Sequence, residues 1–225
     1  MFEGFSEKTR EFLWGLALNN EKSWFEAHRN EYETALLRPF RALALETAEQ
    51  MQQQFPDDGL RLHISRIYRD ARRLHGRGPY KDHLWFSLKS CEGLMCGPAF
   101  WFEVGAVDYS CGMGFYSARA EEMAAFRASV AANPAAFLRI AEPVMRAGVF
   151  ELEGVDYKRP KGDLGEPLNA WYNKRWLGLC RTRPFGTELF SPELPGRLCS
   201  QLATLMPLYR YLRRFYMPQN REENG

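Results

Sequence analysis

Cysteine is scarce in this sequence and follows no pattern that binds metal. The five cysteines are Cys91, Cys96, Cys111, Cys180 and Cys199, and no two of them form a CxxC pair. The four histidines do not lie near them at the intervals typical of metal ligands. We therefore expect reduced thiols, no metal site and no cofactor.

Long hydrophobic runs are missing as well. No stretch approaches the roughly 18 apolar residues that a membrane span needs, and the N-terminal segment MFEGFSEK is unlike a signal peptide. Linkers, internal repeats and low-complexity segments are absent too. Because 45% of the 225 residues are hydrophobic and 14% are aromatic, the composition predicts a folded chain with one substantial core. We expect a single cytoplasmic domain over residues 1–225, with a loose tail at 219–225.

The first third of the chain has helical periodicity. Ser6 is suited to cap a helix that ends at Asn19, and a second helix is expected from near Glu21. A third helix is expected over about residues 31–54, where Pro39 should kink or split it.

Three further helices are predicted in the rest of the chain. One follows Ser117 as its cap, and the next runs from Asn133-Pro134 to Gly148. The last covers about residues 192–216, with a kink at Pro207.

A β meander is predicted between residues 61 and 116. Its four segments are short, rich in aromatic and β-branched residues, and separated by Gly or Pro. They are residues 64–70, 84–88, 99–104 and 109–116. Two more strands are expected around 149–157 and 179–183. Together the elements predict an α+β fold, in which an antiparallel β meander packs against N-terminal, middle and C-terminal helices.

Alternation of side chains along a strand assigns the two faces of this sheet. The core face is expected to hold Leu84, Phe86, Leu88, Phe100, Phe102 and Val104. The opposite face is expected to hold His83, Trp85, Trp101 and Glu103, and, if the first strand continues far enough, Arg66, Asp70 and Arg72. Gly112 and Gly114 should leave room on the sheet for Trp85, Trp101 or a flat ligand. We expect the mixed aromatic and ionisable face to be the functional one.

Positive charge is concentrated in two segments, although the net charge is only +2. Residues 61–89 contain eight Lys or Arg against Asp70 and Asp82, and residues 156–183 contain seven against three acids. Such asymmetry indicates an anionic ligand, and the excess of arginine over lysine around residues 66–81 suits phosphate or carboxylate. The alternative is two solvated basic loops that never meet.

We therefore predict that an anionic small molecule, bearing phosphate or carboxylate, binds in a pocket on the sheet. The predicted ligand-binding residues are Arg66, Arg69, Asp70, Arg72, Tyr80, Lys81, Lys158, Arg159, Lys161 and Lys174. Asp70 is expected to orient the neighbouring arginines, with general-base catalysis as its alternative role. The short loop Gly76–Lys81 is suited to anion binding and lacks the pattern of a nucleotide-hydrolysing phosphate loop.

Other functions stay open at this point. A hydrolase or transferase acting on a phosphorylated substrate would use Asp70, His83 or Glu103, and His83 and Glu103 could also form an acid/base pair or ligate a metal. A protein-interaction module would dock an acidic partner on the same face. Nucleic acid is a further alternative, because aromatic residues alternate with basic ones over residues 157–179, although a net charge of +2 argues against a dedicated non-specific binder.

Several short motifs resemble those of an uncharacterised bacterial family, a domain of unknown function. They are Phe2-Glu3-Gly4-Phe5, Asn19-Asn20 with Trp24-Phe25, Arg66 to Asp70 with Arg72, Pro79-Tyr80-Lys81, Tyr157-Lys158-Arg159-Pro160-Lys161-Gly162 and Trp171-Tyr172-Asn173-Lys174. The chain departs from the family at Arg73-Leu74-His75-Gly76-Arg77, where members often have an aromatic residue and an acidic loop. The resemblance implies a compact intracellular α+β domain and supplies no activity.

Overall fold

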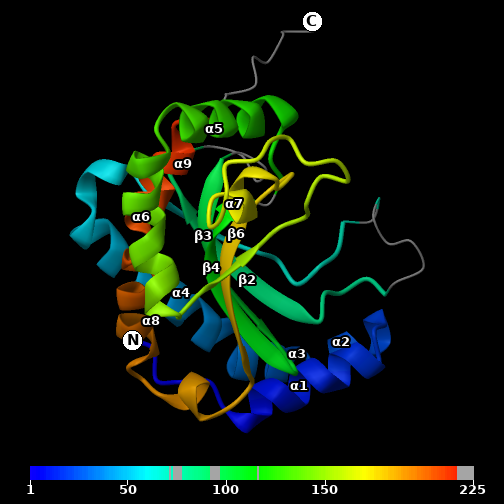
Figure 1. The fold of residues 1–225 in the computed structure, drawn as a ribbon. Coiled ribbons are helices and arrows are strands. Elements are labelled where there is room, and N and C mark those ends of the chain that lie inside the picture. Colours follow the sequence, from blue (N-terminus) through cyan, green and yellow to red (C-terminus); the bar gives the residue numbers. More distant parts are fainter. Residues whose placement is uncertain (71, 73–77, 92–96, 116, 217–225) are drawn as a thin grey trace, which may run out of the picture. The chain divides into compact units, whose positions relative to one another are not determined.

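The computed structural model describes residues 1–70, 72, 78–91, 97–115 and 117–216 (Figure 1). By their contacts these residues form two compact units. The first comprises Met1–Leu88, Trp101–Cys111 and Thr182–Ala203, and the second comprises Lys89–Phe100, Gly112–Arg181 and Thr204–Gly225. The expected tail at 219–225 lies outside the described residues, as do Arg73 to Arg77 and Cys96.

The N-terminal helices of the first unit begin and end close to the predicted positions. They are α1 (Glu7–Leu18), α2 (Lys22–Ala27), α3 (Arg29–Glu31) and α4 (Arg38–Gln54), with a π-helical segment at Tyr32–Leu37. Pro39 does disturb the helix here, because it has no N–H for the carbonyl of Ala35. The Thr9 hydroxyl donates to that carbonyl instead, at 2.6 Å, so the irregular turn is fastened to α1.

The later helices correct two predictions. Helix α5 (Ala120–Ala132) begins after Arg119 and not after Ser117, because the Glu122 carboxylate accepts from the backbone N–H of Arg119 at 2.9 Å. The expected long C-terminal helix is two helices, α8 (Leu194–Ala203) in the first unit and α9 (Met206–Arg213) in the second. Pro207 therefore lies in the first turn of α9, where a missing N–H costs nothing.

Two more helices belong to the second unit. Helix α6 (Pro134–Ala147) begins as predicted, since the Asn133 side chain accepts from the Ala136 N–H at 3.0 Å, and Gly148 ends it with a φ of +64°. The short α7 covers Asn169–Tyr172. None of the helices in the described part of the chain is both long and apolar enough to cross a bilayer.

Six strands form one antiparallel sheet in the order β1-β2-β3-β4-β6-β5. They are β1 (Arg61–Ile64), β2 (His83–Lys89), β3 (Pro98–Gly105), β4 (Asp108–Phe115), β5 (Glu151–Glu153) and β6 (Gly178–Pro184). The meander β1 to β4 and the helices around it confirm the predicted α+β fold.

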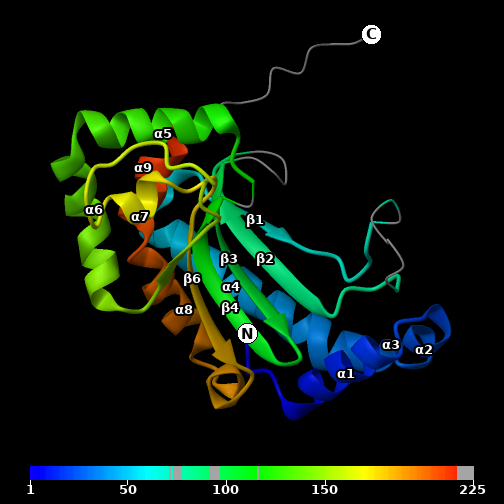
Figure 2. The same cartoon turned by 45° about the vertical axis from the view of Figure 1, so that its right-hand side comes forward.

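The predicted faces of the sheet are also confirmed. Burial alternates strictly along β3, and Phe102 and Val104 are fully buried while Trp101 and Glu103 are half-buried. On the core face of the first unit, Phe40 of α4 packs against Phe86 and Phe102, with ring centroids 5.8 and 6.3 Å apart. Figure 2 shows α4 running behind these strands. Hence the aromatic and ionisable face of β2 and β3 is the face that α4 leaves uncovered.

The first strand was predicted wrongly: it ends at Ile64 and does not span 64–70. The Trp85 N–H donates to the Ser65 hydroxyl at 3.0 Å, not to a backbone carbonyl. The next backbone bond joins Lys81 N–H to the Ile67 carbonyl, so one side advances two residues while the other advances four. Because the regular ladder breaks here, Arg66, Asp70 and Arg72 do not share one strand face.

Gly114 has a different role from the predicted one. A Cβ atom on Gly114 would lie 2.4 Å from the Cα of Gly178 and 2.6 Å from the Leu177 carbonyl oxygen. The glycine therefore makes room for the backbone of Leu177 and Gly178 at the start of β6. It does not make room for Trp85, Trp101 or a ligand.

Candidate functional site

Lys81 is the centre of the candidate site in the first unit. Its backbone N–H donates to Ile67 at 2.7 Å, and its ammonium nitrogen lies 5.8 Å from the centre of the Trp85 ring. Burial lowers the pKa of the Lys81 ammonium, and the nearby guanidinium of Arg69 lowers it further. Among the described residues no carboxylate forms an ion pair with Lys81. We call Arg66, Arg69, Lys81, His83, Trp85 and Glu103 the Lys81 face.

The two arginines of the Lys81 face differ in how many contacts their guanidinium groups make with the rest of the protein. Arg69 donates from Nε to the Tyr80 carbonyl at 2.6 Å, and its Nη2 lies 3.5 Å from Asp82. Arg66 is exposed, and within the described residues no carboxylate pairs with it. Arg69 therefore holds the backbone at Tyr80, whereas Arg66 presents its charge to solvent.

Tyr80 is buried, although it was predicted to contact a ligand. Its ring stacks on Phe25 with centroids 4.2 Å apart. Its backbone is held from both sides by Asn20, whose Nδ2 donates to the Tyr80 carbonyl and whose Oδ1 accepts from the Tyr80 N–H, both at 2.9 Å. Tyr80 and Asn20 thus anchor the segment that carries Lys81.

Asp70 orients Arg72, one of the neighbouring arginines that it was expected to orient. Its two carboxylate oxygens accept from Nε and Nη2 of Arg72 at 3.1 and 2.8 Å, and one of them also accepts from the Arg72 backbone N–H. The Arg72 side chain is 88% exposed, so water screens this pair and it contributes little to stability. A role for Asp70 and Arg72 in ligand binding stays a prediction.

His83 lies between two carboxylates, those of Asp82 and of its predicted partner Glu103. Its Nδ1 is 3.0 Å from Asp82 and its Nε2 is 3.9 Å from Glu103. Burial raises the pKa of the Glu103 carboxyl, with help from Asp108 and Asp82, while His83 and Lys81 act in the opposite direction. Such an arrangement can hold and pass a proton. Within the described ranges no group of three or more His, Cys, Asp or Glu could hold a metal ion.

The raised pKa of Glu103 predicts a pH-dependent gain for E103Q. Below the ordinary value of 4.5 both folded and unfolded wild type are protonated at this carboxyl. As the pH rises above 4.5, the unfolded chain loses this proton first, so ionisation of Glu103 lowers the stability of the fold. We expect E103Q to unfold at a higher temperature than wild type at pH 7 and at the same temperature at pH 4, as measured by circular dichroism. An advantage that grows on acidification would contradict this.

The second basic segment lies in the second unit as far as Arg181. Lys158, Arg159 and Lys161 are exposed, whereas Lys174 is only 12% exposed and donates to Asp156 at 3.1 Å. Lys158, Arg159 and Lys161 form ion pairs with no carboxylate among the described residues. Since the two basic segments belong to different units, each is a candidate on its own.

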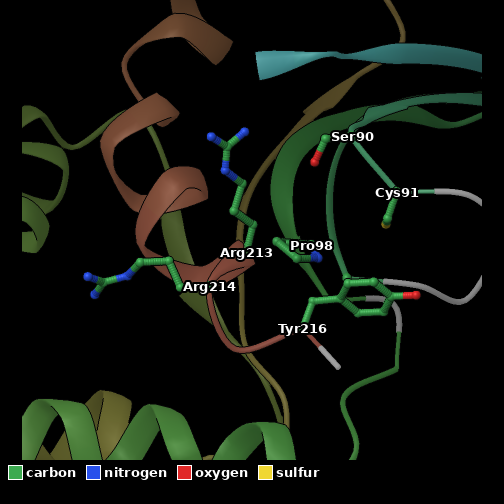
Figure 3. Close-up of a pocket in the computed structure, with 7 residues that line it drawn as sticks. Ser90, Cys91, Pro98, Arg213, Arg214 and Tyr216 are labelled. Carbon is green, nitrogen blue, oxygen red and sulfur yellow. The ribbon is translucent and has the colours of Figure 1, made fainter. Parts of the chain in front are cut away.

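Two cavities lie away from the predicted residues. One, in the second unit, has a volume of about 260 Å³ and is lined by Ser90, Cys91, Gly97, Pro98, Arg213, Arg214 and Tyr216. In Figure 3 the side chains of Arg213 and Arg214 point in different directions. The other has a volume of about 330 Å³ and lies in the first unit between the helical segments 8–12 and 30–35. None of the predicted binding residues lines either cavity.

Comparison with known proteins gives a family and no activity. A family model described as a conserved hypothetical protein (DUF2461) matches residues 8–211. This range includes every residue of the Lys81 face and of the second basic segment. No curated protein shows a significant match. The chain thus belongs to the conserved hypothetical protein family DUF2461.

Proposed function

We propose that the Lys81 face binds an anionic small molecule that carries a phosphate or carboxylate group. The observation that carries this proposal is the half-buried ammonium of Lys81. Arg66 and Arg69 are its like-charged neighbours, and Glu103 opposes them, but within the described residues no carboxylate forms an ion pair with Lys81. A partly buried cation without an ion-pair partner has lost hydration that nothing fully replaces. An oxyanion beside Lys81 would offset the desolvation of the ammonium, and this gain would contribute to the binding free energy.

The surroundings of Lys81 favour a small ligand. Arg66 adds an exposed positive charge, and Trp85 supplies an apolar wall next to the Lys81 ammonium. The His63 ring lies 5.4 Å from Trp85 and extends that wall along the sheet. Ligand sites commonly combine an apolar surface with a few well-placed polar groups.

The test is K81M, titrated with inorganic pyrophosphate and with citrate. We expect wild type to bind at least one of them, and K81M to bind it at least about tenfold more weakly, because a charge-assisted hydrogen bond contributes roughly 1.5–3 kcal/mol. Isothermal titration calorimetry at fixed ionic strength measures both constants. Without ligand, K81M should unfold at a higher temperature than wild type, since it removes an unpaired cation.

Lys22→Met is the matched control. It removes the same charge from an exposed position on α2 in the same unit, so general electrostatic attraction is reduced equally. If K22M weakens binding as much as K81M does, the ligand is held by net charge alone and the proposed site is wrong.

A second candidate function is acid–base catalysis on a phosphorylated substrate. It is favoured by the Asp82–His83–Glu103 arrangement, in which Asp82 orients an imidazole whose other nitrogen faces a carboxyl of raised pKa. In this case H83Q should lower the hydrolysis of p-nitrophenyl phosphate by roughly a hundredfold or more and leave pyrophosphate affinity within about threefold. Wild type without turnover of this substrate would count against the enzyme and leave the binding proposal intact.

A further inference from the structure

Arg127 of α5 has a hydrogen-bond donor that nothing in the described structure satisfies. Its Nη1 atom is buried and makes no hydrogen bond. Its guanidinium carbon lies 5.2 Å from the centre of the Tyr157 ring, and within the described residues no carboxylate forms an ion pair with it. Nearly all buried polar groups in folded proteins have a partner. A charged donor without one is therefore a marker for a missing acceptor.

Positive charge gathers around the same tyrosine. The Lys161 ammonium lies 4.5 Å from the centre of the Tyr157 ring, and Lys158 and Arg159 are exposed on the same short segment. The described structure offers no carboxylate in an ion pair with any of these side chains. Two cations thus lie beside the half-buried Tyr157 ring and two more lie on the same segment, and none of the four has an ion-pair partner among the described residues.

The segment that carries these cations is held in place by Asn173. Its Oδ1 accepts from the Lys161 N–H at 2.7 Å, its Nδ2 donates to the Gly162 carbonyl at 3.1 Å, and its backbone carbonyl accepts from the Tyr157 N–H at 2.9 Å. Asn173 therefore fixes both ends of residues 157–162. A fixed loop loses less conformational entropy when a ligand binds.

We propose that Arg127, Lys161 and the segment 157–162 form an oxyanion-binding site in the second unit, distinct in its residues from the Lys81 face. The guanidinium of Arg127 would supply the missing partner for one oxyanion, in the planar geometry that suits phosphate or carboxylate. The Tyr157 ring would form the apolar side of the site. Because Nη1 is covered by protein, binding must move a neighbouring side chain, and the exposed Lys161, which lies over the same ring, is suited to such movement.

The experiment is a titration of the full chain with pyrophosphate and, separately, with citrate, followed by backbone amide and arginine Nε–Hε resonances in NMR spectra. We expect saturable shifts of the amides of residues 157–162 and Asn173, and of the Arg127 Nε–Hε signal. R127M should weaken the affinity measured at these amides at least about tenfold. The stronger of the two probes identifies phosphate or carboxylate as the preferred group.

Arg139→Met is the matched control, since it removes an exposed arginine from α6 in the same unit. It should change the affinity less than twofold, and K81M should leave these amide shifts unchanged. R127M should fold, because it removes an unsatisfied buried donor, and the Arg127 signal of wild type tests the site without any variant. The proposal is overturned if the shifts do not saturate, if the Arg127 signal stays still, or if R139M weakens binding as much as R127M does. Loss of binding at Lys81 alone leaves this second site standing.

Discussion

Replacing Gly114 with alanine is expected to lower the free energy of unfolding by about 3 kcal/mol or more. The new Cβ would lie 2.4 Å from the Cα of Gly178 and 2.6 Å from the Leu177 carbonyl oxygen. Both are backbone atoms, so no side-chain rotation relieves the overlap. The Phe115 N–H donates to the same Leu177 carbonyl at 3.1 Å, and moving β6 away would weaken that bond. Overpacking of this kind typically costs about 1–3 kcal/mol, and more where the neighbour is rigid.

Urea unfolding of G114A and wild type measures the difference, and Gly196→Ala is the control. Gly196 lies in α8, where a Cβ would meet nothing closer than 3.9 Å. Because alanine is the better helix former, G196A should be neutral or stabilising by up to about 1 kcal/mol. If G114A stays within about 1 kcal/mol of wild type, the close contact between β4 and β6 is wrong.

Replacing Asn20 with alanine is expected to cost about 2 kcal/mol and to weaken anion binding at the Lys81 face. The change removes both hydrogen bonds to the Tyr80 backbone and leaves its N–H unpaired in a buried segment, while the Tyr80 carbonyl keeps the bond from Arg69 Nε at 2.6 Å. An unsatisfied buried group costs about 1–3 kcal/mol. The loss is also transmitted to Lys81, the next residue, because Asn20 holds the backbone in register.

The neighbouring Asn19→Ala is the matched control. Asn19 is exposed and makes one side-chain bond, to the Gly15 carbonyl at 3.0 Å. We expect N19A to cost no more than about 1 kcal/mol and to leave pyrophosphate affinity unchanged, as measured by thermal unfolding and calorimetry. Equal losses in N19A and N20A would show that Asn20 does not position the site.

Local patterns were sufficient for much of the fold. Helical spacing and the Ser6 and Asn19 signals placed α1 within a residue of its observed ends. Strict alternation along β3 assigned its buried and half-buried faces. The same alternation brought His83 and Glu103 together on adjacent strands, where their side chains lie 3.9 Å apart. These features depend on the chemistry of neighbouring residues, which is visible in one dimension.

The errors occurred where a distant segment alters a local preference. Residues 64–70 read as one strand, but the Ser65 hydroxyl takes the place of a backbone acceptor for Trp85 and the pairing loses its register. Residues 192–216 read as one kinked helix, but the chain divides between the two units at Ala203. In both cases the structure divides a segment that was predicted to be continuous.

Composition and spacing were enough to predict an α+β chain with two basic segments and to include Lys81, His83 and Glu103 among the candidate site residues. Three-dimensional contact was needed to find Asn20 as the anchor of Tyr80, 60 residues away in sequence, and Arg127 beside Tyr157. The reason is that a hydrogen bond or an unmatched charge is a property of a pair of groups. The sequence contains both members of each pair, but only the folded structure shows which residues lie close enough to interact.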